Sequence, residues 1–133
     1  MGHDLLFETN RFNLSEVKDH FINPCCFGED LAAWLRGKLL EKGLEVTEPG
    51  QEDWGWYIEA SYGGRWYFIG VGGNAFETGG DKNRGEWRIM LEEHRSVWER
   101  LTRKDEPPGA EEMLAVIRGI LEAEPDFQNV SRE

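Results

Sequence analysis

Two runs of alternating apolar and polar residues flank a Gly-Gly pair in the middle of the chain. The runs cover residues 54–62 and 65–71, and glycines at 63 and 64 separate them. A strand alternates its side chains between two faces, and a two-residue glycine loop is typical of a tight hairpin turn. The sequence therefore predicts a β-hairpin in which Trp56 lies opposite Val71.

The two faces of this hairpin differ in composition. One face is apolar throughout, which suits a protein core. The other face carries large rings beside a carboxylate, contributed by Tyr57, Glu59, Ser61, Trp66, Phe68 and Gly70. Rings mixed with charged groups are typical of binding surfaces, and solvent alone does not favour them. We therefore expect this second face to be covered by another segment or to bind a partner.

Helical periodicity appears at two places in the chain. Apolar residues recur at spacings of three and four over residues 29–42, and Gly43 is placed to end that helix. A second apolar stripe covers residues 110–121, with two acidic residues in the first turn, where the helix dipole favours them. The sequence predicts an amphipathic helix over each range.

Weaker patterns occupy the rest of the chain. Residues 44–48 and 87–92 alternate like strands, and residues 97–101 fit a short helix. Residues 5–22 contain apolar positions without a sustained period, so we expect a short strand or two there. The glycine-rich segment 73–85 is predicted to be a loop.

These elements predict a two-layer α+β fold, with an antiparallel meander of about four strands and two main helices packed on one face. The length of 133 residues suits one domain, which we place at residues 1–124, followed by a flexible tail at 125–133 after the helix-ending proline. The expected core consists of Trp56, Ile58, Tyr67, Ile69, Val71, Trp87, Ile89 and Leu91 on the sheet, and Leu31, Leu35, Leu39, Leu114, Ile117 and Leu121 on the helices.

The second face of the sheet has two possible structural fates besides binding. Either the segment at residues 97–101 or the amino-terminal arm can pack on it, and the sequence does not separate these from an open face.

The chain is strongly acidic, with a formal net charge of −11. Such a field repels phosphate backbones and anionic lipid heads, so we expect neither nucleic acid nor membrane as a partner. No apolar run approaches the roughly 20 residues that span a bilayer, and residues 1–10 lack a leader pattern, so we expect a cytoplasmic protein. The acidity either serves solubility or steers a basic partner toward the protein.

Cysteine and histidine supply the candidates for covalent or metal chemistry. Cys25 and Cys26 are adjacent, and together with His3, His20 and His94 they match no zinc-binding spacing. We expect no metal, no cofactor and no catalytic residues. The alternatives for the two cysteines are buried thiols, or a nucleophile at Cys25 or Cys26 activated by His20 or His94, with Cys26 close to the start of a helix, where a thiolate is favoured.

Part of the chain resembles a set of small uncharacterised bacterial proteins. The matching segments are CCFGEDLAAWL at residues 25–35, EP at 48–49, EDWGW at 52–56 and GEW at 85–87. This resemblance implies a bacterial cytosolic protein and supplies no activity. The small size, the acidity and the two-layer plan are also similar to those of bacterial immunity proteins, which block toxins.

The leading functional hypothesis is a small, acidic, non-enzymatic protein-binding module, most concretely an immunity or inhibitor protein that neutralises a basic partner. The candidate partner-binding residues are Glu48, Glu52, Asp53, Trp54, Tyr57, Glu59, Trp66, Phe68 and Arg88. Rings would supply anchor area, and carboxylates would pair with basic groups. The alternatives are a small enzyme or ligand-binding domain with a Cys/His pair in a pocket between sheet and helices, and a homodimer through the second sheet face.

Overall fold

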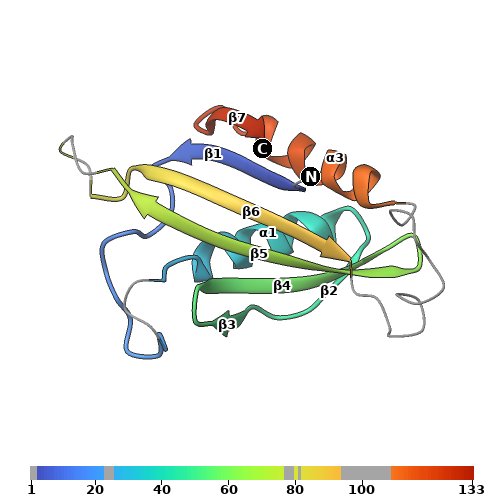
Figure 1. Ribbon diagram of the computed structural model, residues 1–133, viewed down its shortest axis with the longest axis horizontal. Helices are drawn as coiled ribbons and strands as arrows, with labels where there is room; N and C mark the ends of the chain where they lie inside the picture. The colour runs from blue at the N-terminus through green and yellow to red at the C-terminus, as the bar shows by residue number, and fades with distance from the viewer. Residues whose placement is uncertain (1–2, 23–25, 77–79, 81, 94–108) are drawn as a thin grey trace.

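One antiparallel sheet is the central layer of the protein. The computed structural model describes residues 3–22, 26–76, 80, 82–93 and 109–133, and within them the chain forms seven strands and two helices (Figure 1). The strands are β1 (Asp4–Thr9), β2 (Glu45–Val46), β3 (Gly50–Glu52), β4 (Gly55–Tyr62), β5 (Arg65–Ala75), β6 (Gly85–Glu93) and β7 (Gln128–Arg132). The helices are α1 (Glu29–Glu41) and α3 (Ala110–Glu122).

The order of strands in the sheet is β2-β4-β5-β6-β1-β7, and β3 also pairs with β4. The amino-terminal strand β1 therefore lies between β6 and β7, and the two chain ends lie close together (Figure 1). At the opposite edge, β2 and β3 pair with two separate stretches of β4, so this edge is interrupted.

The predicted hairpin is confirmed residue by residue. Trp56 pairs with Val71, Ile58 with Ile69, and the closing pair is Tyr62 with Arg65. The turn glycines have φ angles of 61° at position 63 and 79° at position 64, the left-handed geometry that a two-residue type I′ turn requires. This turn fixes which side chains point to each face of the sheet.

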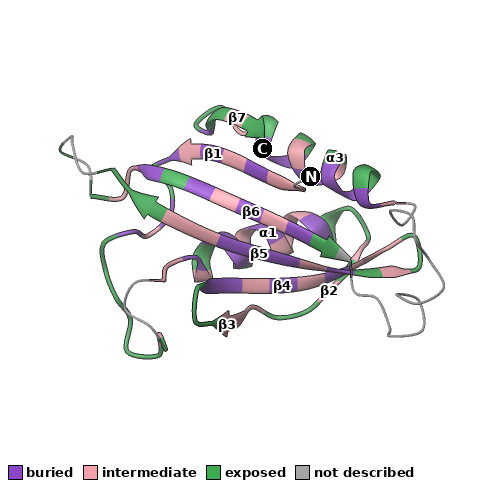
Figure 2. Cartoon of the chain, in the orientation of Figure 1, coloured by how far each residue is buried: buried purple, intermediate pink, exposed green. Residues whose placement is uncertain are grey.

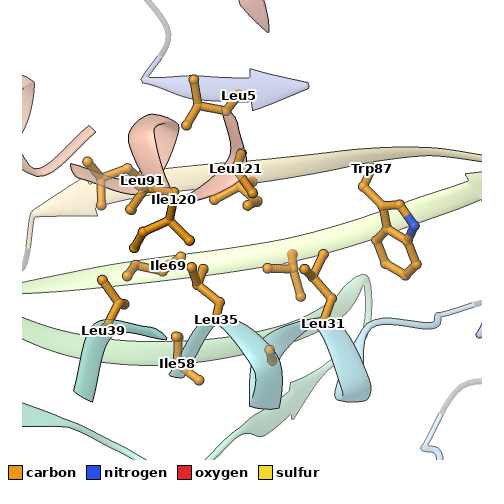
Figure 3. Close-up of a cluster of buried hydrophobic side chains, with 14 of the residues drawn as sticks. Leu5, Leu31, Leu35, Leu39, Ile58, Ile69, Trp87, Leu91, Ile120 and Leu121 are labelled. Atoms are coloured by element: carbon orange, nitrogen blue, oxygen red, sulfur yellow. The ribbon is translucent and has the colours of Figure 1, made fainter. Parts of the chain in front are cut away.

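The core lies between one face of the sheet and both helices. All the sheet and helix residues expected in the core are buried, with no side chain more than 4% exposed. Figure 3 shows leucines of α1 pointing toward Ile58 and Ile69, with Ile120 and Leu121 of α3 beside them. The expectation that both helices pack on one sheet face is therefore correct.

The prediction of a four-stranded meander was wrong. The sheet has seven strands, and its path from β6 to β1 is a crossover rather than a hairpin. Strand β1 buries Leu5, Phe7 and Thr9, but Leu6 is also apolar and hides the alternation. Strands β3 and β7 are short and mostly polar, so they have no hydrophobic period from which they could be predicted.

The expected loop at 73–85 is shorter than the prediction. Strand β5 continues to Ala75 and β6 begins at Gly85, and these two residues are paired. The predicted short helix at 97–101 lies outside the described residues.

The last residues of the chain, for which we expected a flexible tail, form β7 at the edge of the sheet. Phe127 anchors this segment, since its ring is buried and lies 4.7 Å from the Phe7 ring and 5.2 Å from the Trp34 ring. The guanidinium of Arg11 lies 4.5 Å from the centre of the Phe127 ring and pairs with Glu124 at 2.7 Å. Side-chain packing after Pro125, rather than helical periodicity, therefore holds this end of the chain.

Replacing Phe127 with alanine tests this anchor. Removing a buried ring should lower the free energy of unfolding by about 3 kcal/mol, measured by denaturant titration. Ser131→Ala, at an exposed position on β7, is the matched control and should change it by less than about 0.5 kcal/mol. An equally small effect of Phe127→Ala would mean that the segment does not contribute to the core.

Asp126 makes the stability of the segment around Phe127 depend on pH. A hydrogen bond from Arg11 Nε, 3.0 Å long, lowers the pKa of Asp126, and desolvation opposes this only in part. A carboxyl group with a lowered folded-state pKa stabilises the fold above its ordinary pKa, and this stabilisation is lost as the pH falls through the folded value. Because the side chain is 43% exposed, solvent screens the pair.

Asp126→Asn should therefore destabilise the protein by about 0.5–1 kcal/mol at pH 7. The difference from the wild type should start to shrink as the pH falls below about 4, where the unfolded chain takes up a proton at this position. It should vanish below the lowered folded-state pKa, where both folded proteins carry a neutral side chain. Thermal unfolding followed across this pH range measures it. A difference that stays constant down to pH 2 would contradict the assignment.

Candidate functional site

The face of the sheet opposite the helices carries several exposed or half-buried aromatic rings. Among the described residues no helix packs on it, and Figure 2 shows buried and less buried residues alternating along β4, β5 and β6. Trp54 is 43% exposed and Trp66 is 40% exposed, while Phe68 is half-buried. We call this surface the open face. Residues 4–9 of the amino-terminal arm do not cover this face, because they form β1 within the sheet.

Three rings on the open face form a contiguous cluster. Tyr57 and Phe68 stack with their centroids 5.0 Å apart, and Trp54 meets Phe68 edge-on at 6.1 Å. Two glycines make room for these rings. A Cβ atom on Gly70 would lie 2.6 Å from Cη2 of Trp54, and one on Gly50 would lie 2.6 Å from Cζ of Tyr57. The rings therefore lie flat where other strand residues would place side chains.

An open groove with a volume of about 830 Å³ runs beside this cluster. The turn before β4 lines one side with Glu52, Asp53 and Trp54, and β5 contributes Phe68, Gly72, Gly73 and Asn74. Strand β6 contributes Arg88, Met90 and Glu92, and Cys26 and Phe27 complete the lining. This volume is within the range of small-ligand sites, and it accommodates one or two side chains of a protein partner.

Among the described residues, the one basic side chain that lines the groove is held by two carboxylates. Arg88 donates a hydrogen bond of 2.6 Å from Nη1 to Oδ2 of Asp4, and its Nη2 pairs with Glu133. The hydrogen bond to Asp4 is the main cause of a raised pKa for Arg88. Because two carboxylates balance this guanidinium, the other charged lining residues, Glu52, Asp53 and Glu92, give the groove a negative potential.

Five of the nine predicted binding residues line the groove: Glu52, Asp53, Trp54, Phe68 and Arg88. The remaining four lie elsewhere. Tyr57 and Glu59 flank Phe68 on the same face, as its stacking and pairing partners. Trp66 lies farther along β5 beside Ser61, near the hairpin turn. Glu48 lies away from the groove, in the connection between β2 and β3, where it pairs with Arg36 of α1 at 3.2 Å.

The prediction missed three lining residues of interest: Gly72, Met90 and Glu92. The alternation of β6 places Met90 and Glu92 on the same face as Arg88, so that pattern was sufficient to find both. Gly72 has no side chain to mark it, and only the position of the neighbouring Trp54 makes it part of a groove.

The thiol and imidazole candidates are only partly described. The Cys26 thiol lines the groove and donates a hydrogen bond of 3.2 Å to the carbonyl oxygen of Asp53. The His20 ring instead contacts the Glu29 carboxylate at 2.7 Å and packs against Phe21. Cys25 and His94 lie outside the described residues. The pocket also lies on the open face, whereas we expected one between sheet and helices.

The described residues contain no group of three or more histidine, cysteine or acidic side chains arranged to hold a metal ion. None of the described helices has the length and apolar character needed to cross a bilayer.

Comparisons with protein-family models, curated proteins and solved structures give no match to this chain. The resemblance to small bacterial proteins, and the general likeness to immunity proteins, therefore stay predictions.

The close approach of Trp54 to Gly70 gives a test of the site geometry. In Gly70→Ala the added methyl should push the indole away from β5 and weaken its nuclear Overhauser contacts with Phe68 and with the Met90 methyl group. Stability should fall by less than about 1 kcal/mol, because the exposed indole can move without opening the core. Gly119→Ala, where nothing lies within 4 Å of the added Cβ, is the control. Unchanged contacts in Gly70→Ala would contradict the described packing.

Proposed function

We propose that this protein is a non-enzymatic binding module that takes a basic protein partner on the open face of its sheet. An inhibitor of that partner is the most concrete form of the proposal. The observation that carries it is the contiguous cluster of Trp54, Phe68 and Tyr57, which lies beside an acidic groove and under no described helix.

The ring cluster supplies the anchor energy in this proposal. Aromatic side chains in the centre of an interface commonly contribute about 2 kcal/mol or more each, because they bury a large area with few rotatable bonds. Trp54 and Phe68 meet this description, since the strands below hold them and one edge of each remains accessible. Contact with a partner would remove this apolar area from water.

The charge of the chain supplies steering and selectivity. A net charge of −11 attracts a basic partner over distances of about 8–10 Å at moderate salt, and it disfavours acidic partners. Glu52 and Glu92 on the groove would meet the basic groups of that partner directly.

One observation favours the alternative of a small thiol enzyme, because Cys26 lines the groove. However, its Sγ donates a hydrogen bond to the carbonyl oxygen of Asp53, and such a bond stabilises the thiol over the reactive thiolate. The described geometry therefore supports binding better than nucleophilic catalysis.

Affinity capture with matched variants tests the proposal. The immobilised protein should retain a basic partner from a lysate of its source cell, and Trp54→Ser should weaken binding of that purified partner about 30-fold, equivalent to about 2 kcal/mol. Leu40→Ser removes an exposed apolar side chain from α1 and should leave the affinity unchanged. The affinity should also fall steeply as the salt concentration rises.

Two results would count against the proposal. The first is equal affinity of the wild type and Trp54→Ser, which would place the interface elsewhere. The second is an acidic partner or a salt-independent affinity, which would remove the role of the charge.

A further inference from the structure

Gly72 is a lining residue of the groove that brings no side chain into it. A Cβ atom placed on this glycine would have a single neighbour within 4 Å among the described residues, the carbonyl oxygen of Trp54 at 3.8 Å. At Gly70, in contrast, the Trp54 indole already fills the corresponding space. Glycine inside a strand weakens it and often marks a place where a ligand approaches the backbone closely. The hollow over Gly72 is therefore a space that the described side chains leave unfilled.

The groove around this hollow combines ring surfaces with carboxylates. Trp54 and Phe68 line the groove together with Glu52 and Glu92, and Arg88 of β6 is the cross-strand partner of Gly72 itself. Along the cross-strand row through Phe68, Glu59 is the partner on β4 and Glu92 is the partner on β6. Directly opposed side chains in a sheet lie about 5 Å apart at Cβ, so carboxylates flank this ring on both sides. Rings next to carboxylates are the two kinds of group that attract an organic cation.

Arg88 does not cancel this attraction. Its guanidinium is already bound to Asp4 and Glu133, so its charge is balanced by residues outside the groove. A bound anion would have to compete with both of these carboxylates and approach Glu52 and Glu92 as well. The charges of the groove therefore favour a cation.

We propose that the groove over Gly72 receives one arginine side chain of the partner. The planar guanidinium would stack on the Trp54 ring while donating hydrogen bonds to Glu52. Arginine suits this arrangement better than lysine, because a guanidinium can stack on a ring and bind a carboxylate through two hydrogen bonds at the same time. This inference rests on the proposed function and specifies the chemistry of its partner.

A second copy of the chain is a poorer occupant of the groove. Each copy carries a net charge of −11 and would bring the carboxylates of its own open face against those of the other. Like charges that meet in an interface oppose association. A cationic side chain of another protein has no such cost.

Short peptides can test the arginine site without knowledge of the partner. The probe is acetyl-Gly-Ser-Arg-Ser-Gly-amide, titrated into the isotope-labelled full chain and followed by NMR at the Trp54 indole and the Gly72 amide. The matched probe replaces arginine with citrulline, which keeps the shape and removes the charge. We expect saturable shifts at both groups with the arginine peptide, and binding at least 10-fold weaker with the citrulline peptide.

Two variants locate the binding. Gly72→Leu should abolish the shifts, because the new side chain enters the hollow, where its Cβ would meet no described atom closer than 3.8 Å. Glu52→Gln should weaken binding several-fold. Glu112→Gln, on an exposed position of α3, is the charge-matched control and should bind the peptide as the wild type does. Circular dichroism should show that all three variants keep the fold.

Several results would overturn the inference. Equal binding of the citrulline peptide would remove the role of charge, and equal binding by Gly72→Leu would place the peptide elsewhere. A homodimer in sedimentation that Gly72→Leu dissociates would show that a second copy occupies the groove. If the peptide fails while Trp54→Ser still loses the partner, only the arginine site is wrong. If Trp54→Ser keeps the partner, the proposed function itself fails.

Discussion

The register between β4 and β5 is the constraint on which the rest of the structure depends. Side chains alternate along a strand, so a slip of one residue would exchange the two faces of the sheet. The turn at residues 63 and 64 prevents this slip, and it places Ile58 and Ile69 toward the helices while Tyr57 and Phe68 face away. One backbone pairing therefore produces both the core and the aromatic surface.

The two faces reach their packing by different means. On the core side, branched and aromatic side chains of the sheet meet the apolar stripes of α1 and α3. On the open face, the rings of Trp54 and Tyr57 lie against glycines of neighbouring strands, with no second layer described above them. Strand glycines reduce stability, so the core must offset this loss. The result is a rigid sheet that keeps large rings at its surface.

The sequence was sufficient to predict the parts of the fold that local patterns determine. The hairpin, both helices and the core residues have strong periods, and all are present in the structure. A short strand was expected within residues 5–22, but its place in the sheet was not, because β1 pairs with strands far along the chain. Strand β7 was missed, since its polar residues carry almost no period. The anchor for β7 is Phe127, a single buried ring just outside the strand.

For the candidate site, the sequence predicted which kinds of residue share one face of the sheet, but not the groove that they line. Alternation placed rings and charged residues on one face, and five of those residues line the groove. The groove itself exists because the Trp54 ring lies over Gly70 and not over Gly72. The conformation of the turn before β4 determines this position of the ring, and the sequence pattern does not predict that conformation. Glu48 is the predicted binding residue that lies away from the groove. The chain path between β2 and β3 brings its carboxylate to Arg36 of α1 instead.

The interrupted edge of the sheet limits how any partner can approach. One border consists of two short strands, β2 and β3, and the other is the five-residue strand β7, which contains a positive φ angle at Asn129. Neither described border offers a long, regular row of free amide and carbonyl groups, so an incoming chain has little template for main-chain pairing. Such a border also disfavours edge-to-edge strand pairing between molecules, which is a route to fibres. Selectivity in this molecule therefore falls to side-chain shape and charge, which single substitutions can retune without refolding the scaffold.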